Sequence, residues 1–141
     1  MKLRKIVLVI GLLFSTTVFA SEAIVYAAVY ECNADELNQA LVKTCSDSYP
    51  ELFVAASEAM RAWRGRNYAK AKLAKESCEV ELRAKETGMN QAEVDAVQSQ
   101  MSDIKSEIRR NFYAQIRSGG KGACMEALRQ LASGSGAMDF K

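Results

Sequence analysis

The chain has 141 residues, with 19 Lys and Arg, 17 Asp and Glu, and no His. The absence of His excludes imidazole-dependent triads, imidazole general bases and His metal sites. Catalysis by Glu or Lys stays open in principle, but no arrangement of these residues in the sequence points to it.

The first twenty residues have the pattern of an export signal. A basic start at residues 2–5 precedes an apolar run at residues 6–14, which is shorter than the roughly 20 residues of a permanent anchor. Because Ala20 is a small residue of the type that signal peptidase accepts, we expect cleavage before Ser21. An uncleaved anchor is the alternative. The cleaved chain would be periplasmic or secreted, without a permanent membrane span.

Cleavage would change the charge balance. It removes three of the 19 basic residues and leaves 16 against 17 acidic residues, so a nucleic-acid partner is not expected. The remaining length suffices for one domain. The expected organisation is a signal peptide at 1–20, a helical domain at 21–132 and a flexible tail at 133–141.

Four cysteines lie after the cleavage site: Cys32, Cys45, Cys78 and Cys124. An even number of cysteines in a small exported chain predicts two disulfides. A zinc site is the alternative, but the chain has no Cys-x-x-Cys pair and no His. No metal and no cofactor is therefore expected.

Helical spacing of apolar residues prevails from the cleavage site onward. Residues 21–31 suit either a helix or an extended arm. Asn33 and Glu36 resemble a capping box that opens a helix through about Cys45. Pro50 suits the first turn of the next helix. The inward residues expected of these two helices are Leu37, Leu41, Cys45, Leu52, Ala56, Ala59, Met60 and Trp63.

The extent of the helix after Pro50 is open. It either ends or kinks at Gly65 and Asn67, or continues through Cys78 to Gly88. A helix opened by Asn90 follows, with an apolar stripe, and ends at residues 118–120. A last short helix carries three apolar residues on one side. The stripe comprises Val94, Val97, Met101, Ile104, Ile108 and Phe112. The apolar residues of the last helix are Cys124, Leu128 and Leu131. Together these patterns predict an all-α, single, small disulfide-linked bundle of four or five helices.

The helices restrict the disulfide pairing. With a helix between them, Cys32 and Cys45 lie about 20 Å apart, beyond disulfide reach. An up-down arrangement favours Cys32–Cys124 with Cys45–Cys78 over Cys32–Cys78 with Cys45–Cys124. One unbroken helix across Gly65 would reverse that preference.

Two segments are candidate ligand sites. The run Gly119-Gly120-Lys121-Gly122 follows a helix and lacks the Ser or Thr of a phosphate-binding loop, so it predicts an interhelical turn. Residues 61–75 carry six basic residues and no acidic one. On a helix, one side of this segment would present a basic stripe suited to an anionic partner. The alternative is a solvated face paired with acidic neighbours. The stripe, a candidate partner-binding surface, comprises Arg61, Arg64, Tyr68, Lys72 and Lys75.

A wider pattern combines Cys45, Tyr49-Pro50, the segment Ala62-Trp63-Arg64-Gly65-Arg66-Asn67 and the late Cys124. Over these few dozen residues it resembles small exported helical proteins, including the lysozyme-inhibitor-like LprI N-terminal family. The resemblance implies an inhibitor-like role. An exported, disulfide-linked helical domain without a recognisable catalytic motif offers a preorganised surface. We therefore expect a periplasmic, non-enzymatic protein-binding domain, such as an inhibitor or an immunity protein against a cell-wall-targeting enzyme, whose partner is another protein of the cell envelope. An accessory or structural component of an envelope assembly, such as a secretion or conjugation apparatus, is the alternative.

Overall fold

The computed structural model describes residues 26–140, so the predicted signal peptide and residues 21–25 lie outside the described residues. Within this range the secondary structure is helical, and no strand is formed. Residues 26–32 are helical and are followed by α2 (Ala34–Ser48), a 3₁₀ turn η1 (Pro50–Leu52), α3 (Phe53–Glu86) and α4 (Gln91–Ser133). The prediction of a small all-α bundle is confirmed.

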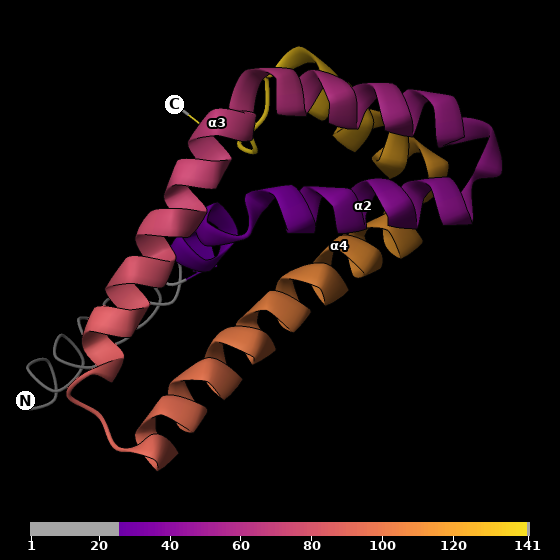
Figure 1. The fold of residues 1–141 in the computed structure, drawn as a ribbon. Coiled ribbons are helices and arrows are strands. Elements are labelled where there is room, and N and C mark those ends of the chain that lie inside the picture. Colours follow the sequence, from indigo (N-terminus) through magenta and orange to yellow (C-terminus); the bar gives the residue numbers. More distant parts are fainter. Residues whose placement is uncertain (1–25, 141) are drawn as a thin grey trace, which may run out of the picture.

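The helices surround α2, which packs against both α3 and α4 (Figure 1). Beyond α2, the end of α3 and the start of α4 continue together to the turn at residues 87–90. We call residues 72–107 the hairpin arm. No helix of residues 26–140 has the length and apolar character required to cross a membrane.

The core is built from the residues that the helical spacing selected. Trp63, Leu37 and Leu131 are completely buried, and they are the largest apolar side chains to be so. Burying such a side chain contributes about 1.5–3 kcal/mol. All the expected inward residues of the two helices around Pro50, and those of the last helix, are buried: Leu37, Leu41, Cys45, Leu52, Ala56, Ala59, Met60, Trp63, Cys124, Leu128 and Leu131.

The hairpin arm has no core of its own. None of residues 72–107 is fully buried, and the apolar stripe of α4 reaches full burial only at Ile108. The preceding members of the stripe, from Val94 to Ile104, are half-buried. The arm is therefore held by a partly solvated apolar seam.

The helix after Pro50 runs without interruption to Glu86, so the second of the two expected alternatives is correct. Gly65 lies within it, and no atom approaches the position that a Cβ would occupy there. A single glycine costs about 1 kcal/mol relative to Ala inside a helix but does not end it. The helix changes direction near its middle without leaving helical geometry (Figure 1).

The expected capping box of α2 is not formed. Asn33 is the N-cap, but its side-chain amide donates to the carbonyl of Val29 at 2.8 Å, because residues 26–32 form a helix that ends there. Glu36 instead forms ion pairs with Lys105 and Arg109 of α4. A complete capping box does occur at α4, between Asn90 and Glu93.

The predicted break after residue 117 is confirmed at Gly120. This glycine has φ 60° and ψ −153° and interrupts α4 between its long first part and its short last part. Only glycine adopts such a backbone readily. Gly134, also at positive φ, ends the helix in the left-handed conformation.

The disulfides join Cys32 to Cys78 and Cys45 to Cys124, with Cα–Cα distances of 5.9 and 5.5 Å. The favoured pairing of Cys32 with Cys124 and Cys45 with Cys78 is therefore wrong. The reason is the continuity of α3, which carries Cys78 past the start of α2 and places it beside Cys32. One bond joins Cys32, just before the start of α2, to α3, and the other joins Cys45, near the end of α2, to α4. Both bonds indicate an oxidising, extracytoplasmic environment.

Candidate functional site

All five residues of the basic stripe line two clefts between α2 and α3, which we call the α2/α3 groove. Arg61 and Arg64 contribute to a cleft of about 560 Å³ beside the second half of α2. Tyr68, Lys72 and Lys75 contribute to a cleft of about 420 Å³ beside the start of α2. The helical spacing of the stripe thus places it along one edge of a groove.

Arg64 crosses the groove between the two clefts. Its guanidinium donates to both carboxylate oxygens of Asp35 on α2, at 2.7 and 2.9 Å. This hydrogen bond raises the pKa of Arg64 further above its usual value. Both side chains are about two-fifths exposed, so the pair is solvent-screened and contributes little to folding.

The other cations of the groove differ in their pairing. Lys72 lies 3.8 Å from Glu76, one turn further along α3. Arg61 and Lys75 have no ion pair within the described part of the chain. These two side chains flank the groove about 21 Å apart along α3, at 1.5 Å per residue. They are the cations most available to an anionic partner.

The groove also contains an exposed aromatic residue that the stripe did not include, Phe53. Phe53, the first residue of α3, is 64% exposed and lines the larger cleft. Tyr68, in the smaller cleft, is 58% exposed. Phe53 falls off the inward spacing of Leu52, Ala56 and Met60, and this was the signal available in the sequence.

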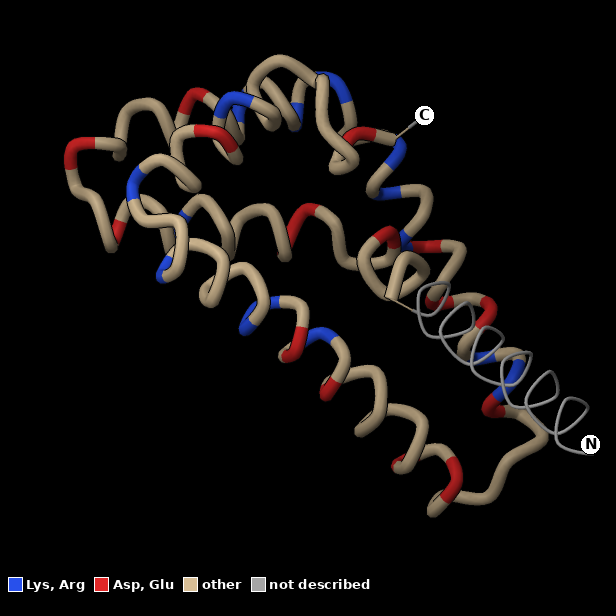
Figure 2. The backbone as a smooth tube through the Cα atoms, turned by 180° about the vertical axis from the view of Figure 1, so that it is seen from behind, with Lys and Arg blue, Asp and Glu red and all other residues tan. Residues whose placement is uncertain are grey.

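Charge is distributed unevenly along the molecule. Residues 76–103 carry seven acidic and two basic residues, whereas residues 61–75 carry only basic ones. Figure 2 shows acidic positions along the start of α4 beside the turn, and basic positions further along the same helix. The hairpin arm therefore has a negative field next to the basic part of α3.

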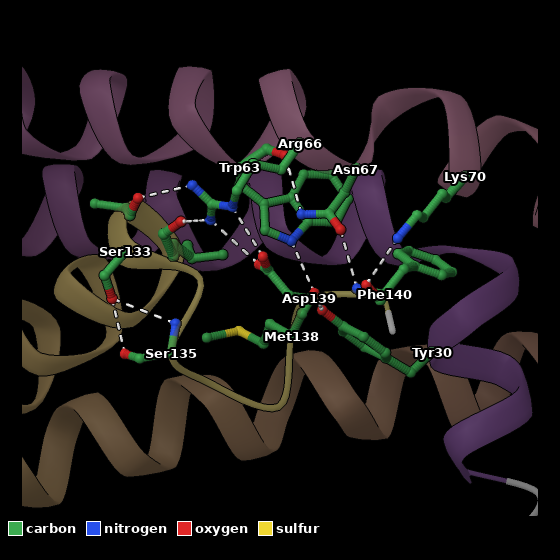
Figure 3. Close-up of polar contacts among 12 residues, drawn as sticks. Tyr30, Trp63, Arg66, Asn67, Lys70, Ser133, Ser135, Met138, Asp139 and Phe140 are labelled. Carbon is green, nitrogen blue, oxygen red and sulfur yellow. Dashed lines mark hydrogen bonds and ion pairs between the residues drawn. The ribbon is translucent and has the colours of Figure 1, made fainter.

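The opposite flank of α3 holds a second polar site, which the sequence reasoning missed (Figure 3). Trp63, Arg66, Asn67 and Lys70 bind residues 138–140, which return along α3 after Gly134. We call residues 134–140 the strap and these four side chains the strap site. Met138 and Phe140 also pack against the core. The segment expected as a flexible tail therefore lies in a defined position, because it carries apolar and acidic residues that match α3.

Arg66 makes the largest number of contacts in the strap site. It donates to both carboxylate oxygens of Asp139, at 2.8 and 3.2 Å. It also donates to the carbonyls of Leu131 and Ala132, which end α4. The hydrogen bond from Arg66 holds the pKa of Asp139 below its usual value, against the opposing effect of burial.

No group of three or more Cys, Asp or Glu side chains in residues 26–140 is arranged to hold a metal ion. All four cysteines are in disulfides. What the described residues offer is two binding surfaces on opposite flanks of α3.

A scan against protein-family models gave no match, and searches of curated proteins and of solved structures gave none either. The resemblance to exported helical inhibitors therefore rests on the residues quoted for it alone.

Proposed function

We propose that the protein is an extracytoplasmic, non-enzymatic domain that binds an acidic surface of another protein through the α2/α3 groove. The observation that supports this proposal is the convergence of the whole basic stripe on one groove. Five carboxylates also line the groove, and four of them are already in ion pairs with cations: Asp35, Glu36, Asp47 and Glu76. Arg61 and Lys75 are without an acidic partner within residues 26–140, and Phe53 and Tyr68 are exposed beside them. Arginine and aromatic side chains are the residues that most often dominate protein interfaces.

The rigidity of the groove favours such a role. One wall is α2, with one disulfide just before its start and another near its end, and the other is the continuous helix α3. A surface that is ordered before binding loses less conformational entropy when the complex forms. A groove whose walls are held in place before binding therefore suits docking of another protein.

The more specific form of the proposal concerns the location and the partner. In this form, residues 1–20 direct export and are cleaved after Ala20, and the domain acts in the periplasm. The partner is an enzyme that attacks the cell wall, and the protein is its inhibitor or its immunity protein. The export pattern and the resemblance to exported helical inhibitors support this version.

The test compares two charge-matched double variants of the chain from Ser21. One is Arg61→Glu with Lys75→Glu, in the groove. The other is Lys85→Glu with Arg110→Glu, which makes the same charge change at exposed positions outside it. Binding to a panel of purified cell-wall hydrolases is measured by calorimetry.

We expect the groove variant to bind its enzyme at least about tenfold more weakly, which corresponds to 1.4 kcal/mol. The control variant should bind within about twofold of the wild type, because only the long-range field changes. Equal binding by both variants, or no hydrolase that binds the wild type, would contradict the proposal.

The second candidate function is an accessory component of an envelope assembly. The half-buried seam of the hairpin arm favours it, because a seam without a fully buried residue can pack against further helices. Sedimentation equilibrium of the wild type and of Val97→Asp tests this candidate. A wild type that stays monomeric at about 100 μM would argue against self-assembly through the seam.

A further inference from the structure

The strap site forms hydrogen bonds with the main chain of the strap at two residues, Met138 and Phe140. The indole N–H of Trp63 donates to the carbonyl of Met138 at 2.8 Å. The side-chain oxygen of Asn67 accepts the amide of Phe140 at 3.0 Å, and Lys70 donates to the carbonyl of Phe140 at 3.2 Å. Residues 137 and 138 form a turn and residue 139 a bend, so these contacts hold a short turned segment by its main chain.

Two contacts add side-chain selectivity. Arg66 binds the Asp139 carboxylate through two hydrogen bonds, a geometry that selects an acidic residue. The ring of Phe140 lies 6.5 Å from the ring of Trp63, tilted by 51°, within the range of favourable aromatic pairs. Lys70 adds a second cation to the site. The chemistry selected is an acidic residue followed by an aromatic residue.

Two of the four side chains also have partners outside the strap. The Asn67 amide donates to the Trp63 carbonyl at 3.1 Å, within α3, and Arg66 donates to the carbonyls of Leu131 and Ala132 in α4. The strap, in contrast, is joined to α4 through Gly134-Ser135-Gly136, a composition typical of flexible linkers. The Arg66–Asp139 pair is partly exposed to solvent. Such a segment can open locally while the helices stay folded.

We propose that this flank of α3 is a peptide-recognition site for a short, turned Asp–aromatic segment of a partner protein, which displaces the strap that occupies it in cis. The four recognising side chains are Trp63, Arg66, Asn67 and Lys70. Charge complementarity supports the choice of partner, because Arg66 and Lys70 are both cationic and the bound residue is an aspartate. The site lies on the flank of α3 opposite the α2/α3 groove, so this proposal stands or falls separately from the proposed function.

The experiment uses the chain from Ser21 with the strap disabled by Asp139→Lys and Phe140→Ser. The probe is a fluorescent, amidated peptide with the sequence of residues 135–140. Trp63 is the one tryptophan of the chain, so its indole N–H signal in NMR reports the site directly. We expect saturable binding to the strap-disabled protein and at least about tenfold weaker binding to the wild type, because a tethered segment competes at a millimolar effective concentration.

Three comparisons locate the binding. Adding Arg66→Gln to the strap-disabled protein should weaken peptide binding at least about tenfold. A peptide with Asp139→Asn should bind several-fold more weakly than the parent peptide. The groove variant Arg61→Glu with Lys75→Glu, combined with the disabled strap, should bind the peptide as before.

The outcomes decide the proposal. A strap-disabled protein that keeps its helical circular dichroism and two disulfides but shows no saturable binding up to several millimolar peptide would overturn it. So would binding that is equal in the wild type, or insensitive to Arg66→Gln. If the double change unfolds the protein, the single variant Asp139→Asn is titrated in the same way, and an unchanged Trp63 signal there would overturn the proposal as well.

Discussion

Arg64 and Arg66 lie two positions apart on α3 and point to opposite flanks of the helix. Arg64 reaches only the exposed carboxylate of Asp35. Arg66 binds Asp139 and, in addition, two carbonyls at the end of α4 that no helical amide can reach. Arg64 therefore makes one solvent-screened ion pair, whereas Arg66 joins the strap and the end of α4 to α3.

This difference gives a matched pair of substitutions. We expect Arg66→Ala to lower the free energy of unfolding by about 1–3 kcal/mol, because charged hydrogen bonds to α4 and the strap are lost. Arg64→Ala should lower it by only about 0–1 kcal/mol. Urea denaturation of both variants and the wild type gives the comparison, and equal losses would contradict the role assigned to Arg66.

Tyr30 links the helix at residues 26–32 to α2 and to the strap. Its hydroxyl donates to the side-chain oxygen of the buried Asn38 at 3.0 Å and lies 3.5 Å from the carbonyl of Met138. Burial raises the pKa of Tyr30 to about 12; the hydrogen bond to Asn38 opposes this rise, and the charge of Asp139 adds to it. The folded protein thus favours the neutral phenol.

The raised pKa predicts a loss of stability at alkaline pH. Since the folded pKa lies above the unfolded value of about 10, the contribution is complete below pH 10 and is lost as the pH rises toward 12. The slope attributable to this one proton reaches about 1.4 kcal/mol per pH unit. The wild type should therefore lose stability faster than Tyr30→Phe over this range, in denaturant titrations at fixed pH. Tyr113→Phe, at an exposed position, should follow the wild type.

At the scale of the helices, two of the three glycines of the turn in α4, Gly120 and Gly122, have different conformational requirements. Gly120 has a backbone conformation that residues with a side chain avoid. Gly122 lies inside the helix, and no atom lies within 4 Å of the position that a Cβ would occupy there. Gly120→Ala should cost about 1–3 kcal/mol of stability, and Gly122→Ala should add up to about 1 kcal/mol. Thermal unfolding followed by circular dichroism measures both. Similar effects of the two substitutions would show that α4 is not broken at Gly120.

Most of the helical pattern was predictable, and its failures have local causes. Apolar spacing identified the buried residues from Leu37 to Trp63 and those of the last helix, because burial follows the 3.6-residue period directly. The capping box at Asn33 failed since the preceding residues are themselves helical and take the Asn33 side chain. The order of the strap depends on contacts across more than 60 residues of sequence, which no local pattern contains.

At the scale of the whole molecule, the disulfide pairing depended on one helix. The sequence left open whether α3 continues past Gly65. Because Cys78 lies beside Cys32 only if α3 is continuous, the pairing was left open as well. The basic stripe was predictable as a helical face, but its position beside α2 was not, because the packing partner of a helix face is a property of the tertiary fold. The strap site was missed because Trp63 was expected only in the core, where it does lie.

The two disulfides differ in their exposure, and this predicts an order of reduction. Cys45 and Cys124 are completely buried, whereas Cys32 and Cys78 are half-buried at the base of the hairpin arm. Under native conditions a mild thiol reductant should open Cys32–Cys78 first, since thiol exchange requires access to a sulfur. Alkylation followed by peptide mass spectrometry identifies the free thiols. Simultaneous release of all four cysteines, or peptides joining Cys32 to Cys124, would contradict the described structure.

The Cys45–Cys124 bond also sets how the molecule carries tension. Pulled at residues 26 and 140, the shortest covalent path runs from Cys32 along α2 to Cys45, crosses to Cys124 and continues to the strap. This path has about 35 residues and extends to about 120 Å, against about 400 Å for the same span without cross-links. The load passes through α2 and the last helix, while α3 and the hairpin arm lie outside the path. If the domain is stretched between two attachments, α2 and the last helix bear the force, and the hairpin arm stays relaxed.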